Sequence, residues 1–470
     1  MSDTITAIST APGEAGIGIV RTSGPASLDI MKKLMAKFPS EVEPRHAYLS
    51  RVVYDSADKG SDVIDQAIFI YMKAPNTYTG EDVLEIQAHG SNVALRCILR
   101  AVLSSGAENV RMAEPGEFTK LAFLNGKMDL SQAEAVIDII KAKTDLSLGI
   151  AESQREGRLS RAVREIRDNL LDTLAQMAVD IDYPDEDEEN VGDGSSSELV
   201  NQLRWVLCDV EELLDTADIG RIAREGVRAV IIGKPNAGKS SLMNAILGEG
   251  RVIVTDVPGT TRDTVEESAS LGGIPIVLVD TAGLRDTEDK VEKIGIERTE
   301  QAIASADLVI LVLDGSRGLD EEDDKVMGYL EHINTEHLLV VINKDDLGNA
   351  ITEEDVQKMF PGAVTITTSL IGRAAEDAAR QISEAVGKMH GLMDLNVREM
   401  NIITSERHVR MLRNAAMNLD EAIGMLKNGE PVEVAELSAR YAYDDLGKII
   451  GEEAGDEIIN TVFSRFCLGK

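Results

Sequence analysis

The stretch RAVIIGKPNAGKSSLMNAILG, residues 228–248, determines the architecture of the central part of the chain. It opens with an apolar run that predicts a strand and closes with a run that predicts a helix. Between them lies Gly-x-x-x-x-Gly-Lys-Ser, from Gly233 to Ser240. Backbone amides of such a loop cradle phosphates, the lysine reaches the outer phosphates and the serine hydroxyl binds magnesium. We expect phosphate contacts, and the catalytic lysine, among Asn236, Ala237, Gly238, Lys239, Ser240 and Ser241.

Further apolar runs on either side extend this loop into a domain. IPIVLVD, DLVILVLDG and HLLVVINK alternate with helical segments, which is typical of a parallel sheet buried on both faces. The sequence before and after this region is mostly helical, and the first part mixes short strands with helices. We therefore predict a multidomain protein: an α+β N-terminal module at 1–118, an all-α helical domain split between 119–219 and 386–470, and an inserted α/β P-loop domain at 220–385.

Composition limits the classes of partner. The 470 residues carry 48 Lys and Arg against 82 Asp and Glu, a formal charge of −34. That charge opposes non-specific binding to a phosphate backbone, so a nucleic-acid contact would need a local basic patch or a partner protein. The N-terminus lacks the pattern of a signal segment and no run is long enough to span a membrane, so we expect a cytoplasmic protein that binds no membrane. Cys97 and Cys208 lie in apolar helical stretches and are expected in the core.

Two later motifs predict a switch and a base-recognition site. In DTAG, residues 280–283, Asp280 can reach the magnesium shell and Gly283 can meet the γ-phosphate. Thr261, in TDVPGTTRD, is the expected switch threonine on magnesium. The base-recognition motif NKDD supplies Asn343, Lys344 and Asp346. A carboxylate such as that of Asp346 pairs with guanine and would be left unpaired by adenine, so the predicted nucleotide is GTP.

The residue after the DTAG glycine departs from the usual glutamine that orients the attacking water. Leu284 stands there, and leucine cannot hold water. Charge on the transferring phosphoryl group must still be stabilised. Asn236, together with carbonyls of residues 255–261, could coordinate a monovalent cation, or a partner could supply an arginine. The residues alone leave both routes open.

Motifs along the whole chain resemble those of the MnmE (TrmE) family of GTPases. The P-loop stretch, TDVPGTTRDTVEE, DTAGLR and VEKIGIER are similar to its GTPase domain. TAPGEAGIGIVRTSG, YTGEDVLEIQAHG, EPGEFTKLAFLNGKMDLSQAEAVIDII and the terminal FSRFCLGK are similar to its other signatures. The terminal Cys-x-Gly-Lys is the most specific of these, because a GTPase domain alone is shared with many relatives.

The resemblance implies a potassium-activated GTPase that modifies carbon 5 of the wobble uridine of certain tRNAs. It implies an aminomethyl or carboxymethylaminomethyl product, made with the flavoprotein MnmG in a heterotetramer. The added carbon would come from a tetrahydrofolate derivative in the 5-formyl or methylene form. The N-terminal module would bind this folate and dimerise, which makes the protein a homodimer.

The resemblance also implies roles for individual residues. The potassium ligands would be Asn236, Thr255, Val257 and Thr260. Magnesium would be bound by Ser240 and Thr261, and Glu292 would orient the hydrolytic water through a second water. Folate contacts would be Arg21, Glu85, Lys127 and Lys470. Cys467 would belong to tRNA modification, whereas the same cysteine taken alone would be assigned to the core.

Some positions depart from the family pattern. Val257-Pro258 replaces the more usual Ile-Ala in the switch loop, and Ser369-Leu370 replaces a Ser-Ala pair that packs on guanine. Two other functions stay open beside the first. One is a GTP-dependent ribosome-assembly switch, which would usually carry a basic RNA-binding domain. The other is a stand-alone folate one-carbon transferase, which would leave the GTPase motifs unexplained.

Overall fold

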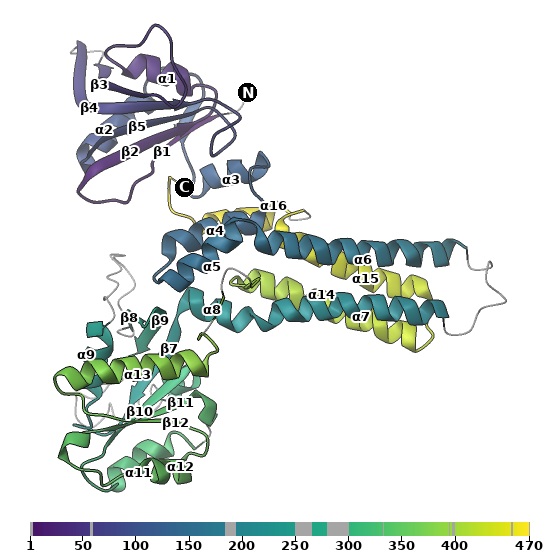
Figure 1. Ribbon diagram of the computed structural model, residues 1–470. Coiled ribbons are helices and arrows are strands. Elements are labelled where there is room, and N and C mark those ends of the chain that lie inside the picture. Colours follow the sequence, from purple (N-terminus) through teal and green to yellow (C-terminus); the bar gives the residue numbers. More distant parts are fainter. Residues whose placement is uncertain are drawn as a thin grey trace, which may run out of the picture. The chain divides into compact units, whose positions relative to one another are not determined.

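The computed structural model describes residues 3–56, 60–183, 194–249, 266–279, 300–331, 333–393, 395–396, 400–452 and 455–469. The chain divides into two units. One is built from two sequence-distant pieces and the other from a long central segment. The first contains Met1–Ile137 and Tyr443–Lys470, and the second contains Asp138–Ala442 (Figure 1). Within the described residues, no helix combines the length and the apolar character that crossing a membrane requires.

A six-stranded sheet forms most of the first unit, in the order β3-β4-β5-β2-β1-β6. Neighbouring strands are antiparallel except for β1 and β6. The strands are β1 (Thr4–Ile8), β2 (Ala15–Ser23), β3 (Ala47–Ser56), β4 (Gly60–Met72), β5 (Val83–Gly90) and β6 (Val110–Met112). Helices α1 (Ser27–Leu34) and α2 (Asn92–Leu103) pack against it, and their apolar residues share one core with Phe69 and Ile86.

The end of the chain packs in the same unit. Helices α3 (Glu117–Leu124), α4 (Leu130–Lys141, whose last residues belong to the second unit) and α16 (Asp456–Ser464) share a small apolar core. At its centre the Phe463 ring lies 6.2 Å from that of Phe123 and 5.5 Å from that of Phe466. Ile458, Ile459, Val462, Phe463 and Phe466 recur at helical spacing, and all of them pack in this core.

Helices of the second unit come from the sequence before and after a second, inserted sheet. They are α5 (Asp145–Arg155), α6 (Arg158–Asp182), α7 (Gly194–Asp215), α8 (Ala217–Glu225) and α14 (Glu406–Lys427), and α15 (Val432–Ile450) begins here and ends in the first unit. Helix α7 packs on both α6 and α14. The expectation that both helical cysteines are core is wrong, because Cys208 is exposed and Cys97 is only half-buried. Cys208 misses the helical stripe that buries Val206 and Val210 on α7.

The second sheet has the order β12-β11-β10-β7-β9-β8 and is parallel except for β8 with β9. Its strands are β7 (Val227–Ile232), β8 (Glu266–Leu271), β9 (Ile274–Val279), β10 (Leu308–Asp314), β11 (Leu338–Asn343) and β12 (Val364–Thr367). The connecting helices are α9 (Lys239–Glu249), α11 (Glu321–Gly328), α12 (Glu353–Met359), α13 (Arg373–Met389) and the 3-10 turns η2 (Thr335–His337) and η3 (Asp345–Leu347). Separate apolar cores lie on its two faces, as the continuous apolar runs predict. The predicted fold class is confirmed.

Two neighbouring segments join this α/β region to the helices. Helix α8 leads into β7, and residues 400–404 lead from the region into α14. The Thr216 hydroxyl donates to the Asn401 carbonyl at 3.2 Å and accepts from the Ile403 amide at 3.1 Å. A Cβ on Gly220 would lie 1.9 Å from the Ile403 carbonyl oxygen, so the two segments touch backbone to backbone.

Candidate nucleotide-binding site

The phosphate loop follows β7 at the carboxyl end of the parallel strands, where ligands bind in open α/β sheets. Its backbone requires glycine at two points. Gly233 has φ +150°, and a Cβ there would lie 2.5 Å from the Val312 carbonyl oxygen. Gly238 has φ +115°, and its Cβ would lie 2.1 Å from Nδ2 of Asn343. Asn236 adopts φ 64°, a left-handed conformation that asparagine tolerates better than most residues.

The predicted phosphate ligands surround the start of α9. The Lys239 ammonium donates to the carbonyl oxygens of Gly233 at 2.8 Å and Lys234 at 2.9 Å, so it spans the loop. Ser240 and Ser241 are both exposed at the helix N-terminus, and Ala237 is buried. Free backbone amides and the helix dipole make such an N-terminus suited to anionic phosphates.

The base-recognition motif follows β11 and is bonded to the phosphate loop. Asn343, only 4% exposed, donates from Nδ2 to the Ala237 carbonyl at 2.7 Å. Its Oδ1 accepts from the Leu370 amide at 3.1 Å. The Asp346 carboxylate is exposed, and the Ser369 hydroxyl donates to its Oδ1 at 2.6 Å. Ser369 therefore orients the carboxylate that is expected to read guanine.

Leu370, where the family pattern has a small residue, lies in the apolar core of the sheet and is 8% exposed. Its backbone amide donates to Asn343, and its Cδ1 would lie 3.6 Å from a Cβ on Gly238 of the loop. A backbone donor does not depend on side-chain size. The larger residue is therefore accommodated by the core and leaves this hydrogen bond in place.

Several predicted site residues lie outside the described residues. They are the switch residues Thr255, Val257, Thr260 and Thr261, the DTAG residues Asp280 and Gly283, the water-orienting Glu292, and the terminal Lys470. Their roles stay predictions.

In the first unit, two of the predicted folate contacts form an ion pair. Arg21 on β2 faces Glu85 on β5 in register, and Nη2 lies 2.8 Å from Oε1. The Arg21 guanidinium also lies over the Phe118 ring, 5.9 Å from its centroid. Lys127 is exposed on another segment, beside the turn at Gly80. The structure thus brings Arg21 and Glu85 together, whereas Lys127 belongs to a different surface segment of the unit.

Cys467 is exposed, contrary to the core assignment that the residue would receive alone. Two residues later, Gly469 (φ +92°) lies so close to β1 that a Cβ would be 2.3 Å from the Ile8 carbonyl oxygen. Ala7, the neighbour of Ile8, pairs with Arg21 in the sheet. The terminal segment therefore lies against the strand that adjoins the Arg21 strand.

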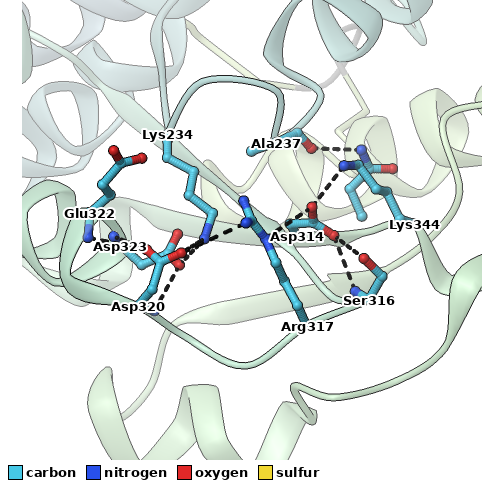
Figure 2. A network of polar contacts seen from close by, with 10 residues as sticks. Lys234, Ala237, Asp314, Ser316, Arg317, Asp320, Glu322, Asp323 and Lys344 are labelled. Atoms are coloured by element: carbon cyan, nitrogen blue, oxygen red, sulfur yellow. Dashed lines mark hydrogen bonds and ion pairs between the residues drawn. The ribbon is translucent and has the colours of Figure 1, made fainter.

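Sequence reasoning missed a buried charge beside the phosphate loop. Lys234, the second residue of the loop, is 1% exposed and bonds to Asp320 and Asp323 on the segment that begins α11 (Figure 2). A lysine after a strand end is usually exposed. Its acceptors lie far away along the chain, so local pattern carried no signal of this contact.

Comparison with known proteins covers the whole chain. A family model described as the MnmE helical domain matches residues 130–467, and one described as the GTP-binding protein TrmE N-terminus matches residues 4–127. The chain is 42% identical over 474 residues to a tRNA modification GTPase MnmE of Clostridioides difficile, covering 100% of both chains. It is 41% identical over 472 residues to the protein of that name in Bacillus subtilis, again covering 100% of both.

Solved structures are similar to part of the chain. One is the G domain of the T. maritima FeoB iron transporter, with 28% identity, 34% of this chain and 98% of that chain covered, and a TM-score of 0.26. Another is a point variant of Aquifex aeolicus Era bound to GDP.AlF4-, with 22% identity, 41% and 66% covered, and a TM-score of 0.26.

Proposed function

The chain belongs to the MnmE family, and on that premise we propose that it is a tRNA modification GTPase. GTP would bind across the carboxyl ends of β7 and β11. The observation that carries this proposal is the direct bond between the two motifs, from Asn343 to the Ala237 carbonyl at 2.7 Å. It ties the motif that would recognise guanine directly to the loop that would take the phosphates.

Residues of the loop suit magnesium and a monovalent cation. The Ser240 hydroxyl is an oxygen donor at the helix N-terminus, of the kind that magnesium prefers, and the Asn236 amide is exposed on the loop. Bound there, the cations would neutralise charge on the transferring phosphoryl group. Lys239 would bind the outer phosphates, and Asp346, oriented by Ser369, would select guanine.

The first unit would serve the modification. Arg21 and Glu85 would hold a tetrahydrofolate derivative, and Cys467, whose segment lies against β1, would serve the modification of carbon 5 of the wobble uridine. The product would be an aminomethyl or carboxymethylaminomethyl group, formed with the flavoprotein MnmG as partner. We further propose that the protein works as a homodimer in the cytoplasm.

Mass spectrometry of wobble nucleosides from a strain lacking this protein tests the proposal. The strain is complemented with the wild type or with Cys467→Ser, and the GTPase activity of each purified protein is measured. We expect the wild type alone to restore the carbon-5 modification while both hydrolyse GTP. If the wild type restores nothing, the ribosome-assembly switch becomes the better hypothesis.

The cation route has its own test. We expect GTP hydrolysis in potassium to exceed that in sodium, and Asn236→Ala to reduce the difference. Equal rates in the two salts would favour an arginine supplied by a partner.

A further inference from the structure

The Lys234 side chain is a buried cation inside the phosphate loop. Lysine is almost never fully buried unless it is paired, and here the partners are two carboxylates. The ammonium lies 2.9 Å from Oδ2 of Asp320 and also bonds to Oδ2 of Asp323, which is 2% exposed (Figure 2). Burial lowers the pKa of Lys234, but these hydrogen bonds outweigh it and the pKa is raised. The ammonium is therefore charged at neutral pH.

Both carboxylates are also held by backbone hydrogen bonds at the start of α11. Asp320 is the N-cap of α11, and its Oδ1 accepts from the amides of Glu322 at 3.1 Å and Asp323 at 3.2 Å. Asp323 completes the capping box, because its Oδ2 accepts from the Asp320 amide at 3.2 Å. Lys234 is thus anchored to the first turn of a helix and not to mobile surface groups.

The other end of the same residue contacts the phosphate-binding lysine. The Lys234 carbonyl oxygen accepts from Nζ of Lys239 at 2.9 Å. A residue whose side chain is fixed at one end holds its own carbonyl in place at the other. The position of the Lys239 ammonium therefore depends on the anchorage of Lys234.

The ion pairs continue from Asp320 to the base-recognition motif. Arg317 lies between two carboxylates, with Nη1 3.8 Å from Asp320 and Nε 3.4 Å from Asp314. Asp314, 5% exposed, also pairs with Lys344 of NKDD at 2.7 Å (Figure 2). The segment 314–323 thus carries carboxylates that bind one lysine from each nucleotide motif.

We propose that Lys234 is a positioning residue for nucleotide binding: its ion pairs with Asp320 and Asp323 hold the phosphate loop in its binding shape. Through Arg317 and Asp314 they tie this shape to the guanine motif. The proposal rests on the proposed binding of GTP at this site. The Lys234 side chain points to the carboxylates of α11, so it would act on the nucleotide only through the loop and the position of Lys239.

The test is nucleotide binding and hydrolysis by the full-length protein. Lys234→Met alone would leave two carboxylates without their cation and risks misfolding. We therefore combine Lys234→Met with Asp323→Asn. The second change removes the negative charge of the buried Asp323 and keeps a side-chain oxygen that can accept from the Asp320 amide. We expect the double variant to raise the Kd for GDP and the KM for GTP about tenfold, a size typical of coupled neighbours. Turnover at saturating GTP should change less than Kd and KM, because Lys234 acts on the nucleotide only through the loop and Lys239.

A matched control exists on α12. Lys358→Met with Asp355→Asn makes the same two changes, and Asp355 is likewise the third residue of a capping box and pairs with its lysine at 3.5 Å. That pair is exposed, so we expect Kd and KM to stay unchanged. Lys234→Arg, which keeps the cation, should recover part of the affinity.

Three outcomes overturn the proposal. One is an unchanged Kd in the double variant at wild-type thermal stability. Another is a fall in turnover with KM unchanged, which would make Lys234 part of the chemistry. The third is a wild-type protein that binds no guanine nucleotide, and this result alone would also overturn the proposed function.

Discussion

A single methyl group at Gly469 should separate GTP hydrolysis from tRNA modification. Gly469 has φ +92°, and a Cβ there would lie 2.3 Å from the Ile8 carbonyl oxygen and 3.0 Å from Cα of Ser9. Both are backbone atoms of a strand end and its neighbour, so they cannot rotate away. An alanine must therefore leave this position or shift the strand.

The size of the effect depends on whether the terminal segment or the end of β1 moves. A left-handed conformation costs an L-residue about 1–2 kcal/mol, which alone shifts an equilibrium about 5- to 30-fold. The overlap with Ile8 adds to that. Because Cys467 and Leu468 are exposed, detaching the segment after the buried Phe466 loses little packing. We expect Gly469→Ala to lower modification at least about fivefold, with the free energy of unfolding and the GTPase rate nearly unchanged.

The assay is the complemented strain, with wobble nucleosides quantified by mass spectrometry and GTP hydrolysis measured on the purified variant. Gly106→Ala is the control, because Gly106 has φ +68° in the same unit and a Cβ there meets nothing within 4 Å. Full modification by Gly469→Ala would refute the reasoning. An equal loss in the Gly106 variant would show that left-handed strain anywhere in the unit suffices.

Three further changes test the packing and the site. Phe463→Ala removes a ring that is 2% exposed and should lower the free energy of unfolding by about 3–5 kcal/mol in chemical denaturation; a loss below about 1 kcal/mol would contradict the packed terminal core. Burial lowers the pKa of His390 below 6.5, so acidification from pH 7 to 5 should destabilise the fold by up to about 1.4 kcal/mol per pH unit; His390→Gln should flatten that slope, and an unchanged slope would assign it to other groups. Leu370→Ala should cost about 2–5 kcal/mol of stability and leave the ratio of KM for GTP and ATP unchanged, since the amide that bonds Asn343 does not depend on side-chain size; a changed ratio would mean that the side chain shapes the guanine pocket.

The sign of the pH effect follows from the folded state. A histidine with a depressed pKa binds its proton more readily when unfolded, so stability rises with pH up to its ordinary pKa and is constant above it. Asp320 has the same sign at lower pH. Its hydrogen bond to Lys234 lowers its pKa to about 2, so its contribution is complete above about pH 4 and is lost as pH falls towards 2.

Local sequence predicted the parts of the site that local chemistry determines. The apolar runs indicated the buried strands β7, β10 and β11, and the glycine spacing indicated a loop in which Gly233 and Gly238 have no room for a side chain. The positions of Lys239, at the start of the helix after β7, and of Asn343, at the end of β11, follow from these patterns. Each depends on residues within a few positions of itself.

Contacts across long sequence separations could not be predicted in this way. Lys234 is buried by acceptors at the start of α11, far away along the chain. Leu370 lies in the core because its side chain turns to that face of the segment after β12. Cys208 lies in an apolar run, yet it falls between the residues that α7 buries. In each case the side chain's direction decides its role, and a one-dimensional pattern does not specify that direction when neighbouring faces are both apolar.

The doubled connection of the α/β region has a mechanical consequence. A domain attached by one strand can swivel about any single bond of its tether. Here α8 and the segment 400–404 are bonded to each other through Thr216, so torsion about one is resisted by the other. The two connections together still permit bending about one axis. A structural change at the nucleotide would then be transmitted to α14 as a rotation about that axis, because free rotation of the α/β region is restricted.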